Sequence, residues 1–329
     1  MSKKAYDQKL EALQALRTAG ASPSTIAELR KTLRDRNNFL VSKAAAIAAD
    51  LSLPDLIPDM LAAFDRFMID PVKTDPQCWA KNAIIKALKN LGHRGAQVYL
   101  RGITHVQMEP VWGGSADTAA TLRGSCALAL AATQLDDIEI LGYLGDALAD
   151  PEKPVRMDAA SAIVQIGRPE GALLLRLKAL LGDPEPDVVG QCFIALVSLV
   201  PRDAVAFLAR FLKSGDDEIR LEAAAALAQS HETEAIQTIE AFWRERLSPQ
   251  LRRAVVLSLA ASPLPTAAEM LLSILAKESS DLAQSAIEAL GQSRFRSEFS
   301  ARAAAIVHDK DDSGMTLAFD RVFAIKATR

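Results

Sequence analysis

The chain has 329 residues, of which 50% are apolar, 24% are charged and only 5% are aromatic, and its formal net charge is −3. This composition excludes a disordered chain, and the charge argues against a globally basic nucleic-acid-binding protein. Because strands favour β-branched and aromatic residues, the composition also disfavours large sheets and barrels. The length alone suggests two globular domains of roughly 100–200 residues each.

The start of the chain is charged and has no apolar signal-peptide core, which argues against secretion. The most apolar stretch, 188–200, is shorter than the roughly 20 residues that a membrane-spanning helix needs. Three cysteines, Cys78, Cys126 and Cys192, are too few and too scattered for a disulfide framework or a zinc site. We therefore expect a cytoplasmic protein with no membrane contact, no metal and no cofactor.

A nine-residue pattern recurs along the chain, and successive copies start 31 to 33 residues apart. The copies begin at Leu122, Val155, Val188, Ile219, Leu251 and Leu282, and less regular ones begin near 41 and 80. Each has aliphatic residues at its first and ninth positions and a small or apolar residue at its fifth. These positions share one face of an α-helix, so each copy predicts an amphipathic helix.

A second apolar segment follows each copy, for example 171–181, and prolines mark the breaks between segments. One helix pair cannot bury both of its apolar faces, so neighbouring copies must stack. We therefore predict an all-α fold, a single right-handed α-solenoid superhelix of about eight helix pairs. In this prediction 1–36 form N-terminal capping helices, 37–314 form the repeats and 315–329 form a C-terminal cap.

The pattern Asp-Pro-Glu-x-x-Val-Arg-x-x-Ala-Ala-x-Ala-Ile at 150–163 resembles a HEAT repeat of the kind named after phycobilisome lyases. The resemblance extends from about residue 35 to about residue 312. Residues 103–117, together with Lys81 and 122–127, are similar to a group of bacterial HEAT-repeat proteins with no assigned reaction. The resemblance implies the fold but not the activity, because such solenoids include scaffolds, lyases, hydroxylases and DNA-repair enzymes.

Two insertions, 64–79 and 103–117, break the period. Extra residues in a solenoid form loops on one face, which is often the binding face. The second insertion contains His105, Glu109 and Trp112. In a helical segment His105 and Glu109 could face one ligand, although two donors are weak evidence for a metal site. The alternative is that this loop folds over a seam of the solenoid and buries Trp112.

Arginine recurs at the second position of the pattern, and acidic residues precede it in several copies. The expected pairs are Asp117 with Arg123, Asp150 with Arg156, and Asp216 with Arg220. We interpret them as an Asp–Arg ladder that ties neighbouring turns together, with phosphate binding as the alternative. Cys126 and Cys192 stand at the fifth position of the pattern, which predicts small core residues before reactive thiols.

We expect the second helix of each pair to form the concave surface. Its candidate contact residues are Arg176, Lys178, Arg210, Lys213, Trp243, Arg244 and Arg246. A tryptophan among arginines is typical of a surface that anchors a partner. The alternative is that Trp243 or Phe242 belongs to the core and the arginines are only solvated.

These observations favour a non-catalytic protein-interaction scaffold or adaptor that binds a protein partner on the concave face and the 103–117 loop. The predicted contact residues are His105, Glu109, Trp112, Arg176, Arg210, Trp243, Arg244 and Arg246. The alternatives are a HEAT-type enzyme similar to a bilin lyase, and a nucleic-acid-binding HEAT protein. We expect no enzymatic activity, because the common catalytic motifs are absent and the chain has one His-Glu dipeptide where the resemblance to deoxyhypusine hydroxylases implies several. The net charge of −3 disfavours nucleic acid, and the sequence leaves the oligomeric state open.

Overall fold

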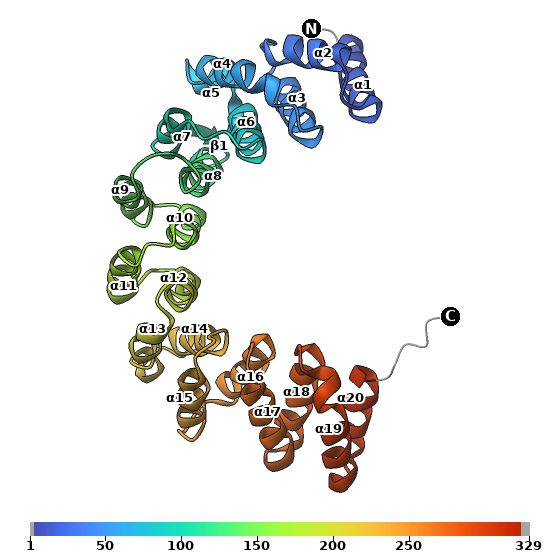
Figure 1. Ribbon diagram of the computed structural model, residues 1–329, viewed down its shortest axis with the longest axis vertical. Helices are drawn as coiled ribbons and strands as arrows, with labels where there is room; N and C mark the ends of the chain where they lie inside the picture. Colours follow the sequence, from blue (N-terminus) through green and yellow to red (C-terminus); the bar gives the residue numbers. More distant parts are fainter. Residues whose placement is uncertain (1–2, 324–329) are drawn as a thin grey trace. The chain divides into compact units, whose positions relative to one another are not determined.

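The computed structural model describes residues 3–323, and the chain divides into two compact units, Met1–Arg168 (unit 1) and Pro169–Arg329 (unit 2) (Figure 1). Nearly all of the regular secondary structure in the described residues is helical, with one two-stranded hairpin in unit 1. The predicted all-α solenoid class is confirmed apart from this hairpin. The single continuous solenoid and its division into caps and repeats stay predictions, and residues 324–329 of the predicted C-terminal cap lie outside the described residues.

Unit 1 begins with two helices and continues with helix pairs that are interrupted by the hairpin. Its elements are α1 (Lys3–Ala19), α2 (Pro23–Leu33), α3 (Asn38–Asp50), a 3-10 turn (Pro54–Leu56), α4 (Ile57–Phe67), α5 (Pro71–Thr74), a 3-10 turn (Pro76–Cys78), α6 (Trp79–Asn90), α7 (Ala96–Ile103), β1 (Met108–Val111), β2 (Gly114–Asp117), α8 (Ala120–Leu130), α9 (Asp137–Ala147) and α10 (Lys153–Ile166).

Unit 2 consists of regular helix pairs without strands in its described part. Its elements are α11 (Gly171–Leu181), α12 (Pro186–Leu199), α13 (Pro201–Leu208), a 3-10 turn (Phe211–Lys213), α14 (Asp217–Ala228), α15 (Thr233–Trp243), α16 (Pro249–Ser258), a 3-10 turn (Leu259–Ala261), α17 (Pro265–Lys277), α18 (Ser280–Gln292), α19 (Arg296–Lys310) and α20 (Ser313–Phe323).

The nine-residue pattern coincides with the first helix of each pair. Its six regular copies begin in α8, α10, α12, α14, α16 and α18. The fifth and ninth residues of all six copies are buried, as the period of the pattern predicts. Cys126 and Cys192 are among them, and burial raises the pKa of the Cys192 thiol to about 12. Both cysteines are therefore core residues that stay protonated at neutral pH.

Proline-containing turns start several of these helices where the sequence predicted them. Asp150 and Asp183 each accept a hydrogen bond from the backbone N–H two residues later, at 2.8 and 2.9 Å. These turns precede α10 and α12, in which Pro154 and Pro186 stand within the first two positions. Proline is tolerated there because the first helical N–H groups have no partner inside the helix.

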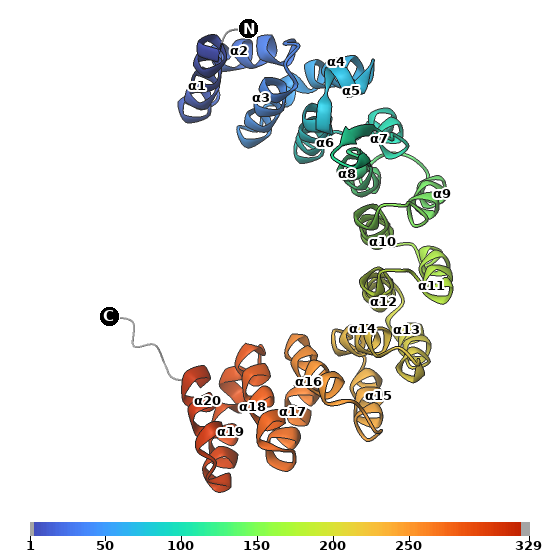
Figure 2. The ribbon, with the colours of Figure 1, turned by 180° about the vertical axis from the view of Figure 1, so that it is seen from behind.

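The rows of helices in unit 2 correct one expectation. Within this unit α12, α14, α16, α18 and α20 lie side by side along the inner side of the curve, and the second helices of the pairs lie outside (Figures 1 and 2). The prediction that second helices form the concave surface is therefore wrong for unit 2. Gly190 of α12 leaves room for the Glu222 side chain of α14, because a Cβ at Gly190 would overlap its carboxylate.

Candidate functional site

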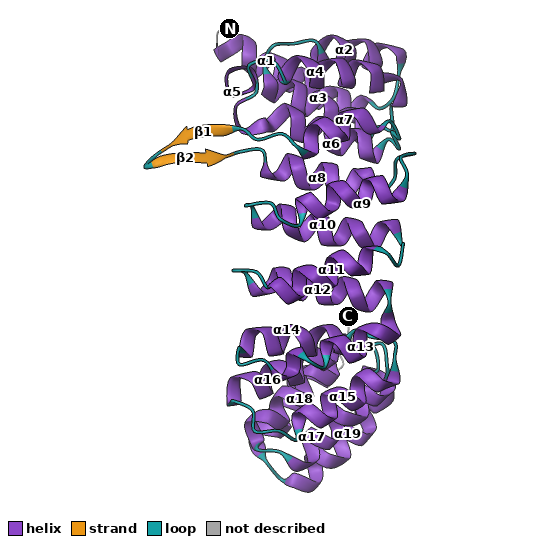
Figure 3. Ribbon diagram, turned by 90° about the vertical axis from the view of Figure 1, so that its left-hand side faces the viewer, coloured by secondary structure: helices purple, strands orange, loops and turns teal. Residues whose placement is uncertain are grey.

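The 103–117 insertion forms a β hairpin that projects beyond the helices of unit 1 (Figure 3). Strands β1 and β2 are antiparallel, and Val111 pairs with Gly114 across a turn formed by Trp112 and Gly113. Gly113 has φ 89°, in the left-handed region that favours glycine. The two glycines of the sequence thus make a tight turn that holds Trp112 at the tip.

The register of the hairpin explains why a proline is tolerated in β1. The backbone N–H of Thr118 donates to the carbonyl of Gln107 at 3.0 Å, so the backbone groups of these two residues point toward each other, between the strands. The backbone groups of every second residue pair after it point the same way. Pro110 pairs with Ser115, which is one of the outward-facing pairs in between. The hairpin therefore loses no internal hydrogen bond to the missing proline N–H.

The Glu109 carboxylate connects the base of the hairpin to the first insertion. It is buried, and its Oε1 accepts hydrogen bonds from the Gln77 backbone N–H (2.6 Å), Gln107 Nε2 (2.6 Å) and Thr118 Oγ1 (2.7 Å). Burial acts to raise the pKa of Glu109, but the hydrogen bonds from Thr118, Gln107 and Gln77 outweigh it and lower the pKa below its ordinary value. The carboxylate is thus charged at neutral pH, and one of its oxygens accepts three hydrogen bonds.

The backbone at Gln77 and Cys78 is strained so that it can reach this carboxylate. Both residues have positive φ, 60° and 54°, although neither is a glycine. Such conformations cost on the order of 1–3 kcal/mol each and persist only where the surroundings hold them. Here they direct the Gln77 N–H at Glu109, which joins the first insertion, 64–79, to the hairpin.

A buried ion pair also fixes the segment that contains Gln77 and Cys78. Asp75 and Lys81 have fully buried side chains, and their charged groups lie 3.0 Å apart. Asp75 also accepts hydrogen bonds from the backbone N–H groups of Ala80 and Lys81 and from Asn38, all at 2.9–3.0 Å. Because each charge is paired and hydrogen-bonded, the pair is stable in the interior and specifies one geometry for the loop.

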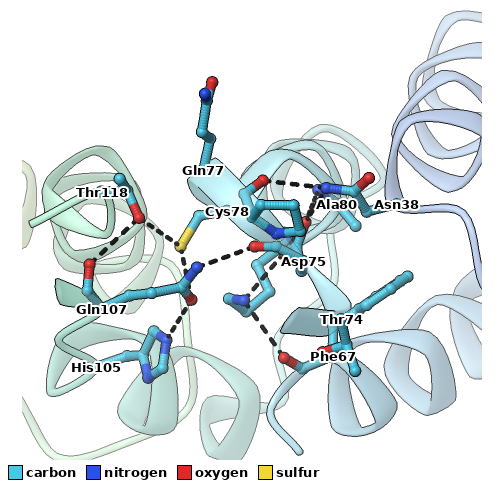
Figure 4. Close-up of polar contacts among 12 residues, drawn as sticks. Asn38, Phe67, Thr74, Asp75, Gln77, Cys78, Ala80, His105, Gln107 and Thr118 are labelled. Atoms are coloured by element: carbon cyan, nitrogen blue, oxygen red, sulfur yellow. Dashed lines mark hydrogen bonds and ion pairs between the residues drawn. The ribbon is translucent and has the colours of Figure 1, made fainter. Parts of the chain in front are cut away.

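Gln107 connects the hairpin to the ion pair (Figure 4). Its amide nitrogen donates to the Asp75 carbonyl at 2.9 Å, and its Oε1 lies 3.2 Å from Cys78 Sγ and 3.1 Å from His105 Nε2. Burial raises the pKa of Cys78 to about 11, so the thiol is a protonated donor. Burial likewise lowers the pKa of His105, which keeps that imidazole neutral near pH 7.

Arg123 connects the base of the hairpin, where β2 ends, to the helical repeats. Its guanidinium is buried and pairs with Asp117 at 2.6 Å and with Asp150 at 2.7 Å, and it donates to the His105 carbonyl at 2.9 Å. The predicted ladder is therefore present at Arg123. It differs at Arg220, which pairs with Asp217 at 2.8 Å.

In two other copies of the pattern, the predicted arginine or acid also bonds to the backbone of a turn. Arg156 donates to the backbone carbonyls of Asp150 and Pro151. Asp216 caps α14 by accepting from the Glu218 N–H. Arg156 and Asp216 thus both contribute to the turns before their helices.

The hairpin exposes apolar side chains to solvent, with Trp112 at its tip. The exposed fraction of Trp112 is 102%, and those of Val106, Met108 and Val111 lie between 49% and 58%. The alternative in which the loop buries Trp112 is therefore wrong. His105 and Glu109 do not share a helix face, because Glu109 lies in β1 and points into the buried network.

A groove of about 680 Å³ runs beside the hairpin within unit 1. Residues from β1, β2, α9 and the turn before α10 line it, including Met108, Ser115, Tyr143, Asp146 and Glu152. A hollow of this size can accept side chains of a bound segment.

The arginines and tryptophan predicted for the second helices lie in unit 2. Arg176 stacks on the Phe207 ring at 4.1 Å and Arg210 approaches the same ring at 5.7 Å. Trp243 is half-buried, donates to Glu278 at 3.1 Å and carries Arg252 over its ring at 4.4 Å. These side chains stabilise the packing of their own unit.

Arg244 and Arg246 follow Trp243 at the end of α15 and are exposed. The predicted residues of unit 2 thus fall into two groups, around Phe207 and around Trp243. The hairpin residues belong to unit 1.

Sequence reasoning missed the supports of the hairpin. The sequence does not identify the residues that contact Glu109 or its neighbours as functional residues. They are Asp75, Gln77, Gln107 and Thr118. The signal that could have found them is the first insertion itself, because it breaks the period just before a helix that holds a lysine, Lys81, at a buried position. No group of three or more His, Cys, Asp and Glu side chains in the described part of the chain could hold a metal ion.

Fold and site together define an α-helical repeat protein with a β hairpin inserted between two repeats. The sequence pattern of the family described as HEAT repeats matches residues 173–260 and 216–291. Residues 173–291 are therefore HEAT repeats, of the kind that the resemblance at 150–163 implied.

Several solved structures are similar to the chain at low identity. The complex of CpcE and CpcF of phycocyanin lyase from Nostoc sp. is 16% identical, with 82% of this chain and 94% of that chain covered and a TM-score of 0.38. Human deoxyhypusine hydroxylase in complex with glycerol is 18% identical over 77% and 88% of the two chains, with a TM-score of 0.31. A mutant of Kap121p is 14% identical over 95% and 42%, with a TM-score of 0.49. No curated protein sequence matches the chain.

Among residues 3–323 no helix combines the length and the apolar character needed to cross a membrane.

Proposed function

We propose that the chain is a non-catalytic scaffold or adaptor that binds a protein partner through the hairpin of unit 1. The observation that carries this proposal is the fully exposed Trp112 at the tip of a hairpin whose base is held by buried polar groups. Exposing an indole to water forgoes its burial energy, and tryptophan is enriched among residues that dominate protein–protein affinity.

The surroundings of Trp112 support a protein partner. Val106, Met108 and Val111 add exposed apolar side chains to the same hairpin, and exposed apolar surface beside an aromatic anchor favours a protein partner. The anchored base means that little conformational entropy has to be lost on binding. A rigid apolar tip of this kind inserts into a pocket of the partner.

Unit 2 offers a second contact surface in the proposal. Arg210, Arg244 and Arg246 are exposed, whereas Arg176 and Trp243 are partly covered by their own neighbours. Exposed arginines at the rim of an interface contribute mainly to orientation and to the association rate. We therefore assign the larger share of the affinity to Trp112.

The experiment is affinity capture from an extract of the source organism with the immobilised chain, comparing the wild type with Trp112→Ala. Proteins held by the wild type and lost from the variant are identified by mass spectrometry and purified. Titration of each purified partner is expected to show at least about tenfold weaker binding to Trp112→Ala, as for an interface hot spot.

Leu317→Ala is the matched control, because Leu317 is an apolar residue of α20 with a 73% exposed fraction in the other unit. The control is expected to retain every partner. Equal capture and equal affinity of all partners by the wild type and Trp112→Ala would contradict the proposal. Trp243→Ala, measured beside them, reports the contribution of the second surface.

A further inference from the structure

We propose that the partner contributes an extended, basic peptide segment that adds as a third strand to the free edge of β2. This inference rests on the proposed function and names the chemistry of the partner. It follows from three features of the hairpin: the difference between its two edges, the groove beside β2 and the charge of that groove.

The edges of the hairpin differ in their free hydrogen-bonding groups. The register turns the backbone groups of Met108 and Pro110 outward on β1, and those of Ser115 and Asp117 outward on β2. Proline has no N–H, so β1 lacks a donor in the middle of its edge. The edge of β2 offers N–H and carbonyl groups at both outward positions and can template a further strand.

The side chains of β2 leave room for such a strand. Gly114, Ser115 and Ala116 are small and exposed. The edge of β1, by contrast, lacks an N–H at Pro110. Strand addition is therefore directed to β2.

The groove of about 680 Å³ lies where the side chains of an added strand would fall. Ser115, Ala116 and Asp117 of β2 form part of its lining, and Val106, Met108 and Tyr143 give it apolar surface. Successive side chains of a strand point to opposite faces, so every second residue of the added segment enters this groove. The groove thus selects a segment with apolar residues at alternate positions.

The charge of the lining favours basic residues in the added segment, because an electric field extends about 8–10 Å beyond the groove itself. Asp117, Asp146, Asp150 and Glu152 are acidic, and Arg123 is the basic residue among the lining side chains, which gives four negative charges against one positive, a net of −3. Lysine or arginine in the added segment complements this charge. A second copy of the chain is disfavoured as the occupant, because two linings of net charge −3 would repel each other.

The experiment uses an array of decapeptides in which lysine alternates with Val, Ile, Leu, Phe or Tyr, and a matched array in which glutamate replaces lysine. Fluorescently labelled full-length chain is applied, and the affinity of the strongest lysine peptide is then measured in solution by anisotropy. The lysine array is expected to bind and the glutamate array to bind at least about tenfold more weakly. Absence of binding to the lysine array overturns the proposal.

Two substitutions at one position test the strand edge. Ser115→Pro removes the outward N–H of β2 and is expected to weaken binding of the lysine peptide by about tenfold or more, whereas Ser115→Ala keeps that N–H and leaves the affinity within about twofold. Because proline could also distort β2, the same peptide methylated on alternate backbone nitrogens is titrated against the unaltered chain. It is expected to lose binding by a similar factor.

Retained binding of both the methylated peptide and Ser115→Pro would overturn strand addition. If the captured protein partner nevertheless loses affinity for Trp112→Ala, the proposed function stands without the third strand. If Trp112→Ala has no effect on that partner either, both proposals fall. Light scattering of the chain alone completes the test: a dimer that Ser115→Pro dissolves would overturn the peptide as occupant in favour of a second copy.

Discussion

The hairpin region of unit 1 and the regular repeats of unit 2 achieve stability by different means. In unit 2 the buried positions of the repeat pattern are apolar, and its arginines pair near the surface. Around the hairpin the interior contains charged and polar groups, with Asp75, Lys81, Gln107 and Glu109 all buried. Apolar packing suffices to stack helices, whereas a projecting hairpin needs directional bonds to hold it in one position. The predictions below test this difference.

The largest expected effect is that of breaking the buried ion pair. Lys81→Met leaves the Asp75 carboxylate buried without its partner and is expected to lower the free energy of unfolding of unit 1 by about 3–5 kcal/mol. Urea unfolding followed by intrinsic tryptophan fluorescence and by amide exchange measures this change. Arg321→Gln, which removes an exposed pair with Glu288 in unit 2, is the control and should cost less than about 1 kcal/mol. Equal small effects of the two substitutions would contradict the assigned role of the ion pair.

A smaller and more local effect is expected from the hairpin carboxylate. Glu109→Ala removes the acceptor of three hydrogen bonds and leaves buried donors unsatisfied, each worth about 1–3 kcal/mol. The hairpin should lose protection in amide exchange while α12 to α18 keep theirs. Glu109→Gln retains an acceptor oxygen and should lie between the wild type and Glu109→Ala. Global unfolding of both units by Glu109→Ala would show that the network supports more than the hairpin.

Acid is expected to weaken the hairpin through the same group. Because the folded-state pKa of Glu109 is lowered, its contribution to stability is present above the unfolded pKa, about 4.3, and is lost as the pH falls through the lower folded value. Asp117 is lowered for the same kind of reason and acts in the same direction. Amide exchange of the hairpin measured from pH 6 to pH 3 should show this loss. In Glu109→Gln the acid dependence should be reduced, and an unchanged dependence would rule out Glu109 as its source.

The smallest effect on stability is expected at Trp112, to which the proposed function assigns the largest share of the affinity. Trp112→Ala removes a side chain that is fully exposed, so the free energy of unfolding should change by less than about 0.5 kcal/mol. Trp243→Ala removes a half-buried ring under Arg252 and a hydrogen bond to Glu278, so it should cost more. Thermal unfolding of the two variants compares them directly. A larger loss at Trp112 than at Trp243 would mean that the hairpin tip packs against the protein.

The sequence predicts the repeats well and the hairpin support poorly. The period of Val155, Val188 and their counterparts reflects local helical geometry, which depends on residues only a few positions apart. The sequence pattern does not indicate the strands, because β1 has only four residues and one of them is Pro110. The contacts of Asp75 and Gln107 depend on the positive φ angles at Gln77 and Cys78. Neither glutamine nor cysteine indicates such a backbone conformation in the sequence.

The predicted contact residues show the same division. The sequence favours Trp112 as a contact residue because it stands in an irregular loop, and the structure places it at an exposed tip. The expectation for the concave surface failed because the burial period identifies a helix face without saying on which side of the curve the helix lies. The arrangement of the helices in three dimensions reveals that (Figures 1 and 2).

The most direct test of an anchored, projecting hairpin is residue-resolved amide hydrogen exchange over 107–118. The inward amide of Ala116 should exchange slowly and the outward amide of Ser115 rapidly, and Glu109→Ala should abolish this difference. This result would establish that the buried network holds the hairpin while β2 keeps a free edge. Equally rapid exchange of both amides in the wild type would contradict the account, because a mobile hairpin could not present Trp112 in a fixed position.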